Sequence, residues 1–332
     1  MARTWPKTKV LVTGAGGFIG SHLTEALVEL GSDVTAMIRY SSRSDWGNLE
    51  FLSEDKKSAL RVVAGAVEDS HFVSHHVRGK DIVFHLAALI GIPYSYIAPD
   101  SYVRTNVIGT TNILESAHEF DVSRVVHTST SEVYGTAKYT PIDEKHPIQP
   151  QSPYSASKGG ADMIAESFYR AFHTPVAIIR PFNTYGPRQS ARAVIPTIIS
   201  QVVGGSAEIQ LGSVNPIRDL TFVKDTVRAF VKIAETDHAV GKIINIGAGR
   251  GITIHDLAKL VLEITQVDKP IVEDAIRKRP SNSEVFQLIA DNSQAEEILG
   301  WKPQYTLAQG LSETIDFISK NLHLFKVGQY AL

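Results

Sequence analysis

The chain has 332 residues, of which 43% are apolar and 20% are charged, and its formal net charge is −2. This composition predicts a globular protein with a substantial core, arranged as one large or two modest domains. The near-neutral charge provides no basic field for nucleic acid, so we expect no such partner. The longest apolar stretch, Ile82–Pro93, is too short to span a bilayer, and the N-terminus lacks an apolar signal core. Zero cysteines exclude disulfides, thiolate catalysis and cysteine-ligated zinc. We therefore expect a cytoplasmic protein without membrane association.

Short β-branched runs alternate with amphipathic segments over the first 180 residues. In chain order, the strand candidates are Val10–Val12, Val34–Ile38, Arg61–Val63, Ile82–Leu86, Arg124–His127 and Val176–Ile179. Between the first two, apolar residues from Leu23 to Leu30 recur at helical spacing, and Gly31 is placed to end that helix. Continuous apolar strands separated by helices predict an α/β fold, a Rossmann-type doubly wound parallel sheet with helices on both faces.

The rhythm changes after Arg180, where proline and glycine become more frequent. Later segments such as Ile254–Ile264 and Ala308–Leu322 show helical periodicity. We therefore predict a first domain over residues 1–180 and a smaller C-terminal domain over 181–332. The segment at about 219–247 is expected to return to the first domain, through Thr221–Phe230 and Ile243–Gly247.

The first strand runs into a glycine-rich turn, Thr13-Gly14-Ala15-Gly16-Gly17-Phe18-Ile19-Gly20. Gly14, Gly17 and Gly20 allow a tight turn and close approach of a diphosphate to the backbone. Phe18 and Ile19 open the next helix, whose N-terminal amides favour an anion. Because this turn opens a βαβ unit, it predicts a dinucleotide site.

The end of the second strand bears on the choice of dinucleotide. An acid usually stands there to hold the ribose hydroxyls of NAD, but here no acid occurs before Asp45. Arg39 with Ser41 suits a 2′-phosphate, which favours NADP. The alternative is an exposed arginine beside a site for NAD.

Two segments carry hydroxyl, carboxyl and amine groups in a pattern typical of hydride transfer. Tyr154 and Lys158 lie four residues apart, so they share one helix face. Thr130 and Glu132 follow the fifth strand candidate and add a hydroxyl and a carboxylate. The same Tyr-x-x-x-Lys spacing recurs from Tyr134, but there it runs through a glycine into a polar stretch, so we do not interpret it as a catalytic pair.

These motifs together resemble the extended short-chain dehydrogenase/reductase family over nearly the whole chain. The resemblance rests on Thr-Gly-x-x-Gly-x-x-Gly, His85-Leu86-Ala87-Ala88, Asn106, Tyr154 with Lys158, and Arg180-Pro181-Phe182-Asn183. Within that family, Thr130-Ser131-Glu132 resembles the nucleotide-sugar 4,6-dehydratases, especially the GDP-mannose type. Longer strings, including Arg180–Ala193, are similar to the legionaminic-acid-pathway dehydratases. This implies a GDP- or UDP-linked N-acetylglucosamine as substrate.

The resemblance also implies the residues that bind each ligand. The cofactor would be held in the first domain by the glycine-rich turn and by Ala66, Val67, Leu86, Ala87, Ala88, Asn106, Tyr154, Lys158 and Pro181. The sugar nucleotide would contact Asn183, Arg188, Arg218 and Arg279, in the second domain. One departure is Gly65-Ala66, where the family usually has Gly-Asp with an adenine-binding aspartate. Adenine contact there must be through backbone or apolar atoms, such as Val67.

The chemistry follows from the residue types. Tyr154 can take the C4 hydroxyl proton if its pKa falls, which the Lys158 charge favours, and Thr130 can hydrogen-bond the same oxygen. Glu132 can then take the C5 proton that the C4 ketone has acidified and drive loss of the C6 hydroxyl as water. Ser131 stands where glucose-type relatives have an acid, so either Glu132 or Ser131 protonates the leaving group. The bound NAD(P) would be tightly held and recycled, and no metal is required.

Two alternatives to a 4,6-dehydratase remain open. A nucleotide-sugar decarboxylase or 4-epimerase would use the same oxidation at C4, although epimerases usually lack the acid at position 132. The second alternative is a non-catalytic dinucleotide-binding regulator on the same fold. The resemblance further implies a homodimer through the helix beginning at Tyr154 and the helix at about Val107–His118, with Ile113, Leu114, Ala161 and Ala165 as modest support.

Overall fold

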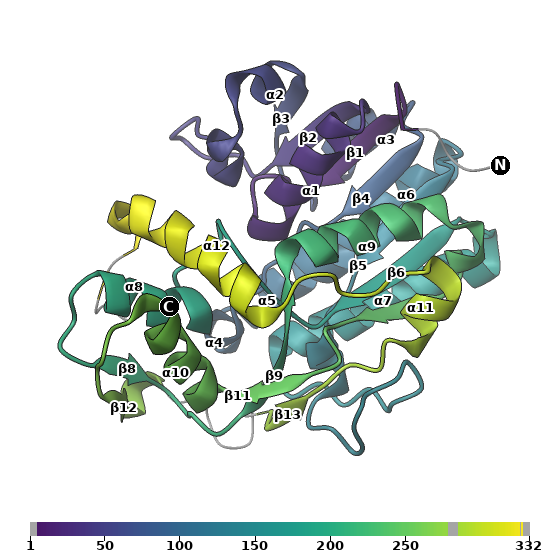
Figure 1. The fold of residues 1–332 in the computed structure, drawn as a ribbon. Coiled ribbons are helices and arrows are strands. Elements are labelled where there is room, and N and C mark those ends of the chain that lie inside the picture. The colour runs from purple at the N-terminus through teal and green to yellow at the C-terminus, as the bar shows by residue number, and fades with distance from the viewer. Residues whose placement is uncertain (1–4, 278–284, 326, 328–332) are drawn as a thin grey trace.

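The computed structural model describes residues 5–277, 285–325 and 327 (Figure 1). The strands are β1 Lys9–Thr13, β2 Asp33–Ile38, β3 Leu60–Ala64, β4 Ile82–His85, β5 Arg124–Thr128, β6 Val176–Pro181, β7 Asn183–Tyr185, β8 Ile209–Leu211, β9 Ile217–Phe222, β10 Ile243–Ile246, β11 Gly251–Thr253, β12 Ile271–Glu273 and β13 Gln287–Leu288. The α-helices are α1 Phe18–Glu29, α2 Glu54–Ser58, α3 Ser70–Val77, α4 Ile92–Ile97, α5 Pro99–Tyr102, α6 Gly109–Glu119, α7 Pro153–Phe172, α8 Val194–Val203, α9 Val223–Glu235, α10 Ile254–Thr265, α11 Ser293–Leu299 and α12 Leu307–Lys320. The six predicted strands and the three predicted helices with stated bounds coincide with elements of this set to within a few residues.

Seven parallel strands of the described chain form the large sheet, in the order β10-β6-β5-β4-β1-β2-β3. Alternate residues of each strand face opposite layers. In β5, for example, Val126 packs with α1 and α9, whereas Val125 packs with α3, α6 and α7. The predicted doubly wound parallel sheet is confirmed. Its strand order reverses between β1 and β4, where open α/β sheets bind ligands beyond the carboxyl ends of the strands.

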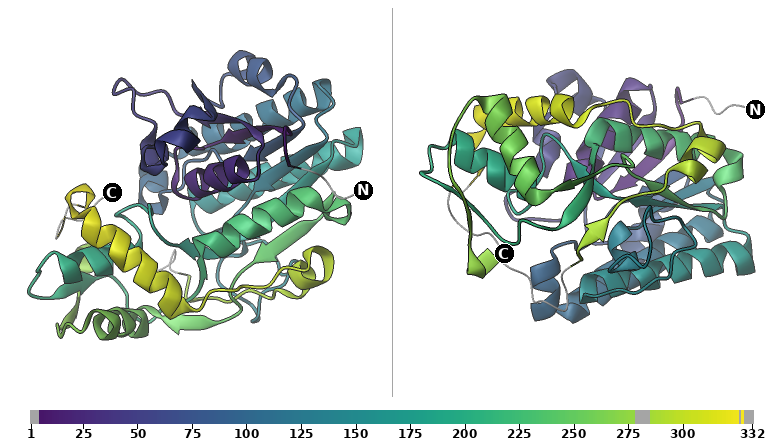
Figure 2. Two further views of the ribbon diagram at one scale, coloured as in Figure 1. Left: turned by 45° about the horizontal axis from the view of Figure 1, so that its top comes forward. Right: turned by 60° about the horizontal axis from the view of Figure 1, so that its bottom comes forward.

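The second lobe begins at that carboxyl edge, since β6 ends at Pro181 and β7 begins at Asn183. It contains a sheet ordered β11-β9-β13, with β7 also paired to β9, and a β12-β8 ribbon. Helices α8, α10 and α12 cover it, and two further views place this lobe beside the large sheet (Figure 2). Its apolar residues join the same core cluster as α1 and α9, so the two lobes share one continuous core.

The segment at 219–247 divides between the lobes. Helix α9 packs on β5 and β6, and β10 pairs with β6 in the large sheet. The first residues of the segment, Asp219–Phe222, lie in β9 of the smaller sheet.

The predicted helix near Val107 begins irregularly. Residues Val103–Ile108 form a π-helical turn that leads into α6 and directs Asn106 inward, where it is fully buried. Such π turns are frequent at functional sites. The four residues that we offered as support for a dimer contact, Ile113, Leu114, Ala161 and Ala165, all lie in the core with 0% exposure. They therefore cannot form a surface contact, because other parts of the same chain already cover them.

Within the described ranges, no helix has both the length and the apolar character that crossing a membrane requires.

Candidate active site

The glycine-rich turn after β1 forms a cradle at the reversal point of the sheet. Gly14 has φ +70°, and a Cβ built there would lie 2.8 Å from the Ala87 nitrogen in the turn after β4. A Cβ on Gly20 would lie 2.1 Å from the Gly14 oxygen, so a side chain at either position would break the turn. Helix α1 begins after Gly17 without a capping side chain, which leaves its first-turn amides for an anion. The cradle therefore fits a dinucleotide diphosphate.

Other predicted cofactor residues border the same edge. Leu86, Ala87 and Ala88 follow β4, and Asn106 holds that segment at both polar groups of Leu89. Asn106 Nδ2 donates to the Leu89 carbonyl at 3.0 Å, and its Oδ1 accepts from the Leu89 amide at 2.8 Å. Asn106 Nδ2 also donates to Ser157 Oγ on α7 at 2.9 Å. Asn106 thus ties the turn after β4 to the helix that carries Tyr154 and Lys158.

The residues proposed to bind the adenosine half are placed less uniformly. Arg39 and Ser41 are exposed just after β2 ends at Ile38. Ala66 is exposed as well, whereas Val67 is 5% exposed and packs on Gly109. The Val67 carbonyl accepts from Asn112 Nδ2 at 2.9 Å. Most of the Val67 side chain therefore faces the core, and its contact with adenine stays a prediction.

Helix α7 carries the predicted phenol and amine into the interior. It begins with a capping box between Ser152 and Ser155, which fixes the first turn where Tyr154 lies. Tyr154 is 8% exposed and Lys158 is 4% exposed. Burial lowers the pKa of Lys158 to about 8, opposed by the negative charge of Asp162. Lys158 therefore loses its proton far more readily than an ordinary lysine.

Tyr154 meets the hydroxyl and carboxylate of the turn after β5. Burial raises the pKa of Tyr154, a side-chain hydrogen bond from Thr130 opposes that rise, and the charge of Glu132 adds to it. Loss of the Tyr154 proton near neutral pH would therefore require a nearby positive charge, such as that of Lys158. Thr130, at 9% exposure, caps the 3₁₀ helix Ser131–Tyr134 by accepting from the Glu132 amide at 3.2 Å. Thr130 and Glu132 thus both act on the Tyr154 phenol, the first by a hydrogen bond and the second by its charge.

One side of the site is aromatic, which the sequence analysis did not anticipate. The Tyr102 ring meets the Tyr154 ring edge-on at 6.3 Å between centroids, and Tyr94 lies 6.2 Å from Tyr102. The Tyr102 hydroxyl donates to the Gly91 carbonyl. A Cβ on Gly91 would lie 3.0 Å from Arg192 Nη1, so the second lobe reaches this side of the site. In the sequence, only the run of tyrosines around residues 94–102 could have indicated this aromatic side.

The predicted substrate residues fall in three different environments. Asn183, in β7, has a buried Oδ1 without a hydrogen-bond partner, so this oxygen could accept a hydrogen bond from a ligand. Arg188 instead pairs with Glu25 of α1 at 2.8 Å, with 10% of its side chain exposed. Arg218 is buried in β9, where its Nη1 donates to the Ile217 carbonyl at 3.1 Å. Arg279 lies outside the described residues.

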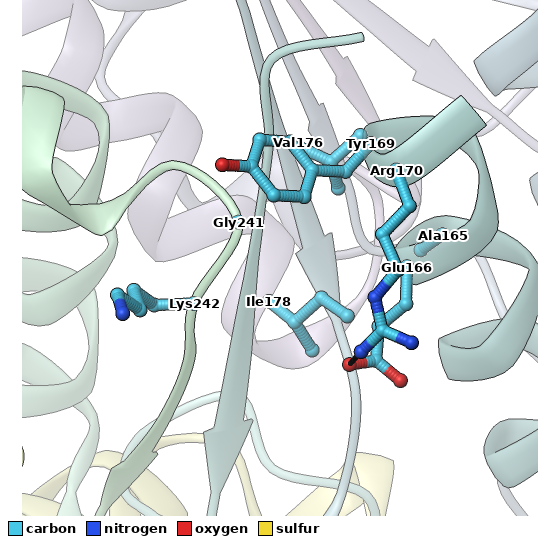
Figure 3. A pocket seen from close by; sticks show the side chains of 8 residues that line it. All are labelled: Ala165, Glu166, Tyr169, Arg170, Val176, Ile178, Gly241 and Lys242. Carbon is cyan, nitrogen blue, oxygen red and sulfur yellow. Dashed lines mark hydrogen bonds and ion pairs between the residues drawn. The ribbon is translucent and has the colours of Figure 1, made fainter. Parts of the chain in front are cut away.

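A small surface pocket lies elsewhere, along the second half of α7, the strand β6 and the two residues that precede β10 (Figure 3). Its polar lining includes Glu166 and Arg170, which pair with each other at 3.0 Å. These residues are twelve or more positions from Tyr154, or about 18 Å along a helix. The pocket is therefore separate from the candidate site. The described part of the chain also contains no cluster of three or more His, Asp or Glu side chains arranged to hold a metal ion.

Comparison with known proteins agrees with this arrangement. A family model described as GDP-mannose 4,6 dehydratase matches residues 11–314. The dTDP-D-glucose 4,6-dehydratase of Mus musculus is 32% identical over 333 residues, covering 98% of this chain and 92% of that protein. The structure of dTDP-glucose 4,6-dehydratase from Streptomyces venezuelae, solved with NAD, has a TM-score of 0.87 at 29% identity and covers 96% of this chain and 98% of its own. UDP-glucose 4-epimerase from Thermotoga maritima, solved with UDP-glucose, has a TM-score of 0.85 at 32% identity, with 94% and 99% covered. The chain therefore belongs to the GDP-mannose 4,6-dehydratase family, among the nucleotide-sugar dehydratases and epimerases of the extended short-chain dehydrogenase/reductases.

Proposed function

We propose that the protein is a nucleotide-sugar 4,6-dehydratase that yields a 4-keto-6-deoxy sugar nucleotide. The observation that carries this proposal is the position of Glu132, whose charge acts on the same phenol that Thr130 hydrogen-bonds. Of the chain's own side chains, oxidation at C4 by a bound NAD(P) would need only Tyr154, Lys158 and Thr130. A carboxylate added beside them suits removal of a second proton from the carbon next to the new ketone.

The chain's own groups account for the proton movements. When bound, NAD(P) would accept a hydride from C4 and return it to C6. Tyr154, as the phenolate, takes the C4 hydroxyl proton, and the charged amine of Lys158 stabilises that phenolate. Thr130 donates a hydrogen bond to the same sugar oxygen. Because these groups are buried, bulk water does not weaken their interactions.

The elimination step belongs to the turn after β5. Glu132 takes the proton from C5, the C5–C6 double bond forms, and the C6 hydroxyl leaves with a proton as water. We assign that second proton transfer to Glu132 as well, because a serine hydroxyl such as that of Ser131 is a poor acid at neutral pH. Reduction at C6 and return of a proton to C5 complete a reaction with no net oxidation.

The substrate proposed is a GDP- or UDP-linked N-acetylglucosamine. The unpartnered Asn183 Oδ1 supports a polar ligand at the start of the second lobe. We keep Arg188, Arg218 and Arg279 as further candidates for the sugar nucleotide. Arg188 pairs with Glu25 through Nη2, whereas its buried Nη1 has no hydrogen-bond partner. Incubation with GDP- and UDP-linked N-acetylglucosamine, GDP-mannose, dTDP-glucose and UDP-glucuronate, followed by mass spectrometry, tests the choice.

The same screen separates the alternatives. A dehydratase product is lighter by one water, a decarboxylase product is lighter by one CO₂, and an epimerase product keeps its mass. We keep 4-epimerase as the second candidate function because the relative from Thermotoga maritima is a UDP-glucose 4-epimerase. A regulator without activity would leave every sugar unchanged.

Glu132→Gln tests the residue-level assignment. The amide keeps the side-chain shape and removes the base, so water loss should slow by roughly 10²–10⁴ while oxidation at C4 survives. The variant should accumulate bound 4-keto sugar, and C5 should stop exchanging its proton for solvent deuterium. Tyr154→Phe serves as the matched contrast, since it should block the first oxidation itself. Water loss at the wild-type rate in Glu132→Gln would refute the assignment.

We also propose that NAD(P) stays bound through many turnovers, that the protein is a cytoplasmic homodimer, and that neither nucleic acid nor membrane is a partner. The exposed Arg39 after β2 supports NADP, whereas the Streptomyces venezuelae relative was solved with NAD. Purified protein should turn over with little added cofactor. Stoichiometric release of reduced cofactor would contradict the recycling scheme.

A further inference from the structure

A buried arginine outside the proposed catalytic set joins the two halves of the site. Arg180, near the end of β6, is 1% exposed. Its Nε and Nη2 donate to Asp162 Oδ2 at 3.2 and 2.9 Å, and its Nη1 donates to the Tyr134 hydroxyl at 3.0 Å. The guanidinium fork therefore holds α7 on one side and the turn after β5 on the other. A planar fork with fixed donor directions suits such a bridge.

The hydrogen bonds from Arg180 to Asp162, here called the first arm, end one helical turn from Lys158. Asp162 lies four residues after Lys158 on α7 and is 1% exposed. Besides Arg180, it accepts from Ser129 Oγ at 2.5 Å and from His127 Nε2 at 3.0 Å. Despite the cost of burial, these bonds and the Arg180 charge lower the pKa of Asp162 to about 2. Asp162 is therefore a permanent negative charge beside the catalytic amine.

The hydrogen bond from Arg180 to Tyr134, here called the second arm, ends two residues from Glu132. Tyr134 closes the 3₁₀ helix Ser131–Tyr134 and is 0% exposed. Because its oxygen accepts from Arg180, its own hydrogen goes to Asn245 Oδ1, at 2.8 Å. The guanidinium also lies 5.0 Å from the centre of the Tyr134 ring. Tyr134 thus anchors the short turn that presents Glu132.

We propose that Arg180 is a positioning residue that sets the geometry between Glu132 and the Tyr154–Lys158 pair through two separable arms. The Asp162 arm governs oxidation at C4, and the Tyr134 arm governs the elimination. This inference rests on the proposed function, because it takes Glu132 as the base for C5. The second Tyr-x-x-x-Lys match, which we discounted as a catalytic pair, thereby gains a supporting role for its tyrosine.

Tyr134→Phe tests the second arm with a single oxygen removed. The turn keeps its ring but loses its hydrogen bonds to Arg180 and Asn245, so Glu132 should shift. We expect water loss and C5 deuterium exchange to slow by about 10–100-fold, the effect of misplacing a catalytic group by roughly 1 Å. Oxidation at C4, followed as bound 4-keto sugar, should stay within about twofold. Tyr185→Phe is the matched control, because Tyr185 is 1% exposed and donates a single bond to the Leu307 carbonyl at 3.0 Å.

Asp162→Asn tests the first arm through a pH profile. Lys158 is faced by Tyr154 and Asp162, each one helical turn away on α7, and by His127 and His85 from the sheet, while Arg180 lies beyond Asp162. Of these, Asp162 raises the pKa of Lys158, so its neutralisation should let the amine lose its proton at lower pH. The alkaline fall in the rate of C4 oxidation should therefore move to lower pH. A merely structural role would lower the rate without moving the profile.

Arg180→Lys completes the test, since one ammonium cannot span both arms. It should impair oxidation and elimination together, and adding Tyr134→Phe should slow elimination no further. Thermal midpoints of all variants show whether each is folded. Equal slowing of both steps by Tyr134→Phe, or an unmoved pH profile in Asp162→Asn, would overturn the inference. If the proposed function itself is wrong, wild-type protein will show no water loss. That result differs from a variant in which the rates of oxidation and elimination change relative to each other.

Discussion

The hydroxyl of Thr13 lies 2.9 Å from His85 Nδ1, across the pair of strands where the sheet order reverses. The same oxygen accepts from the amides of Leu86 and Ala87, each at 3.1 Å. Since both lone pairs are taken, the Thr13 hydrogen must point to His85 Nδ1, which leaves the ring proton on Nε2. That proton faces Thr110 Oγ1 at 3.0 Å. Burial holds the pKa of His85 well below its usual value, so the ring stays neutral.

We expect Thr13→Val to loosen the cofactor cradle. The isosteric side chain keeps the packing but leaves the Ala87 amide and His85 Nδ1 without their partner, at a cost of about 1–3 kcal/mol in the free energy of unfolding. Because the turn after β4 lines the cradle, affinity for NAD(P) should fall too. Thr24→Val is the control, since the buried Thr24 hydroxyl has no partner to lose. Calorimetric titration of cofactor and urea unfolding measure both effects, and equal behaviour of the two variants would contradict the prediction.

Burial of Lys158 should make the active site a source of instability. Its pKa falls from 10.5 to about 8, a shift that corresponds to about 3 kcal/mol as an upper bound. Below pH 8 the amine is charged in both states, so folding bears the full cost of burying the charge. Between pH 8 and 10.5 only the unfolded state keeps the proton, so wild-type stability rises with pH.

Lys158→Met should therefore abolish turnover and yet raise the free energy of unfolding by about 1–3 kcal/mol at pH 7. The gain should shrink as the pH approaches 10.5. Urea unfolding of both proteins at pH 7 and pH 10 measures it, with exposed Lys259→Met as the control. A variant less stable than wild type at pH 7 would show that the charged amine is better satisfied than its burial indicates.

The layers of the fold were predictable from local pattern, whereas the couplings within the site were not. Strands such as Val10–Val12 and the glycine turn after them follow from period and backbone freedom, which are properties of short segments. Asn106, Arg180 and Asp162 act through partners 17 to 51 residues away along the chain. The i to i+4 spacing of Lys158 and Asp162 was the one available signal. Arg188 pairs with Glu25 across 163 positions, and no local sequence pattern in either segment predicts this ion pair.

Arg39→Ala should separate the two forms of the cofactor. The exposed guanidinium after β2 can make a charge-assisted bond to a 2′-phosphate, and that bond exists only with NADP. Affinity for NADP should fall by about 10–100-fold, and affinity for NAD by less than about threefold. Arg43→Ala, an exposed arginine on the same loop, is the matched control. Equal weakening of both cofactors, or a wild-type preference for NAD, would show that Arg39 does not read the phosphate.

The proposed homodimer makes a prediction for the outer faces of α7 and the π turn. Because Ala161 and Ala165 are buried, a dimer contact would have to use other apolar side chains. Met163 is 59% exposed on α7, and Ile108 is 46% exposed on the π turn. A stable interface buries about 800 Å² per partner around such apolar residues. A charge at its centre would remain unpaired and desolvated, which strongly opposes association.

Light scattering of wild-type protein at micromolar concentration should give twice the chain mass of 36.3 kDa. Met163→Asp should give the monomer mass. Ile276→Asp places the same charge on an even more exposed residue, at 76%, in the second lobe, so the dimer should persist there. A monomeric wild type would refute the homodimer. A dimeric Met163→Asp variant would place the contact on a different face, because α7 cannot pair through Met163 with an aspartate at its centre.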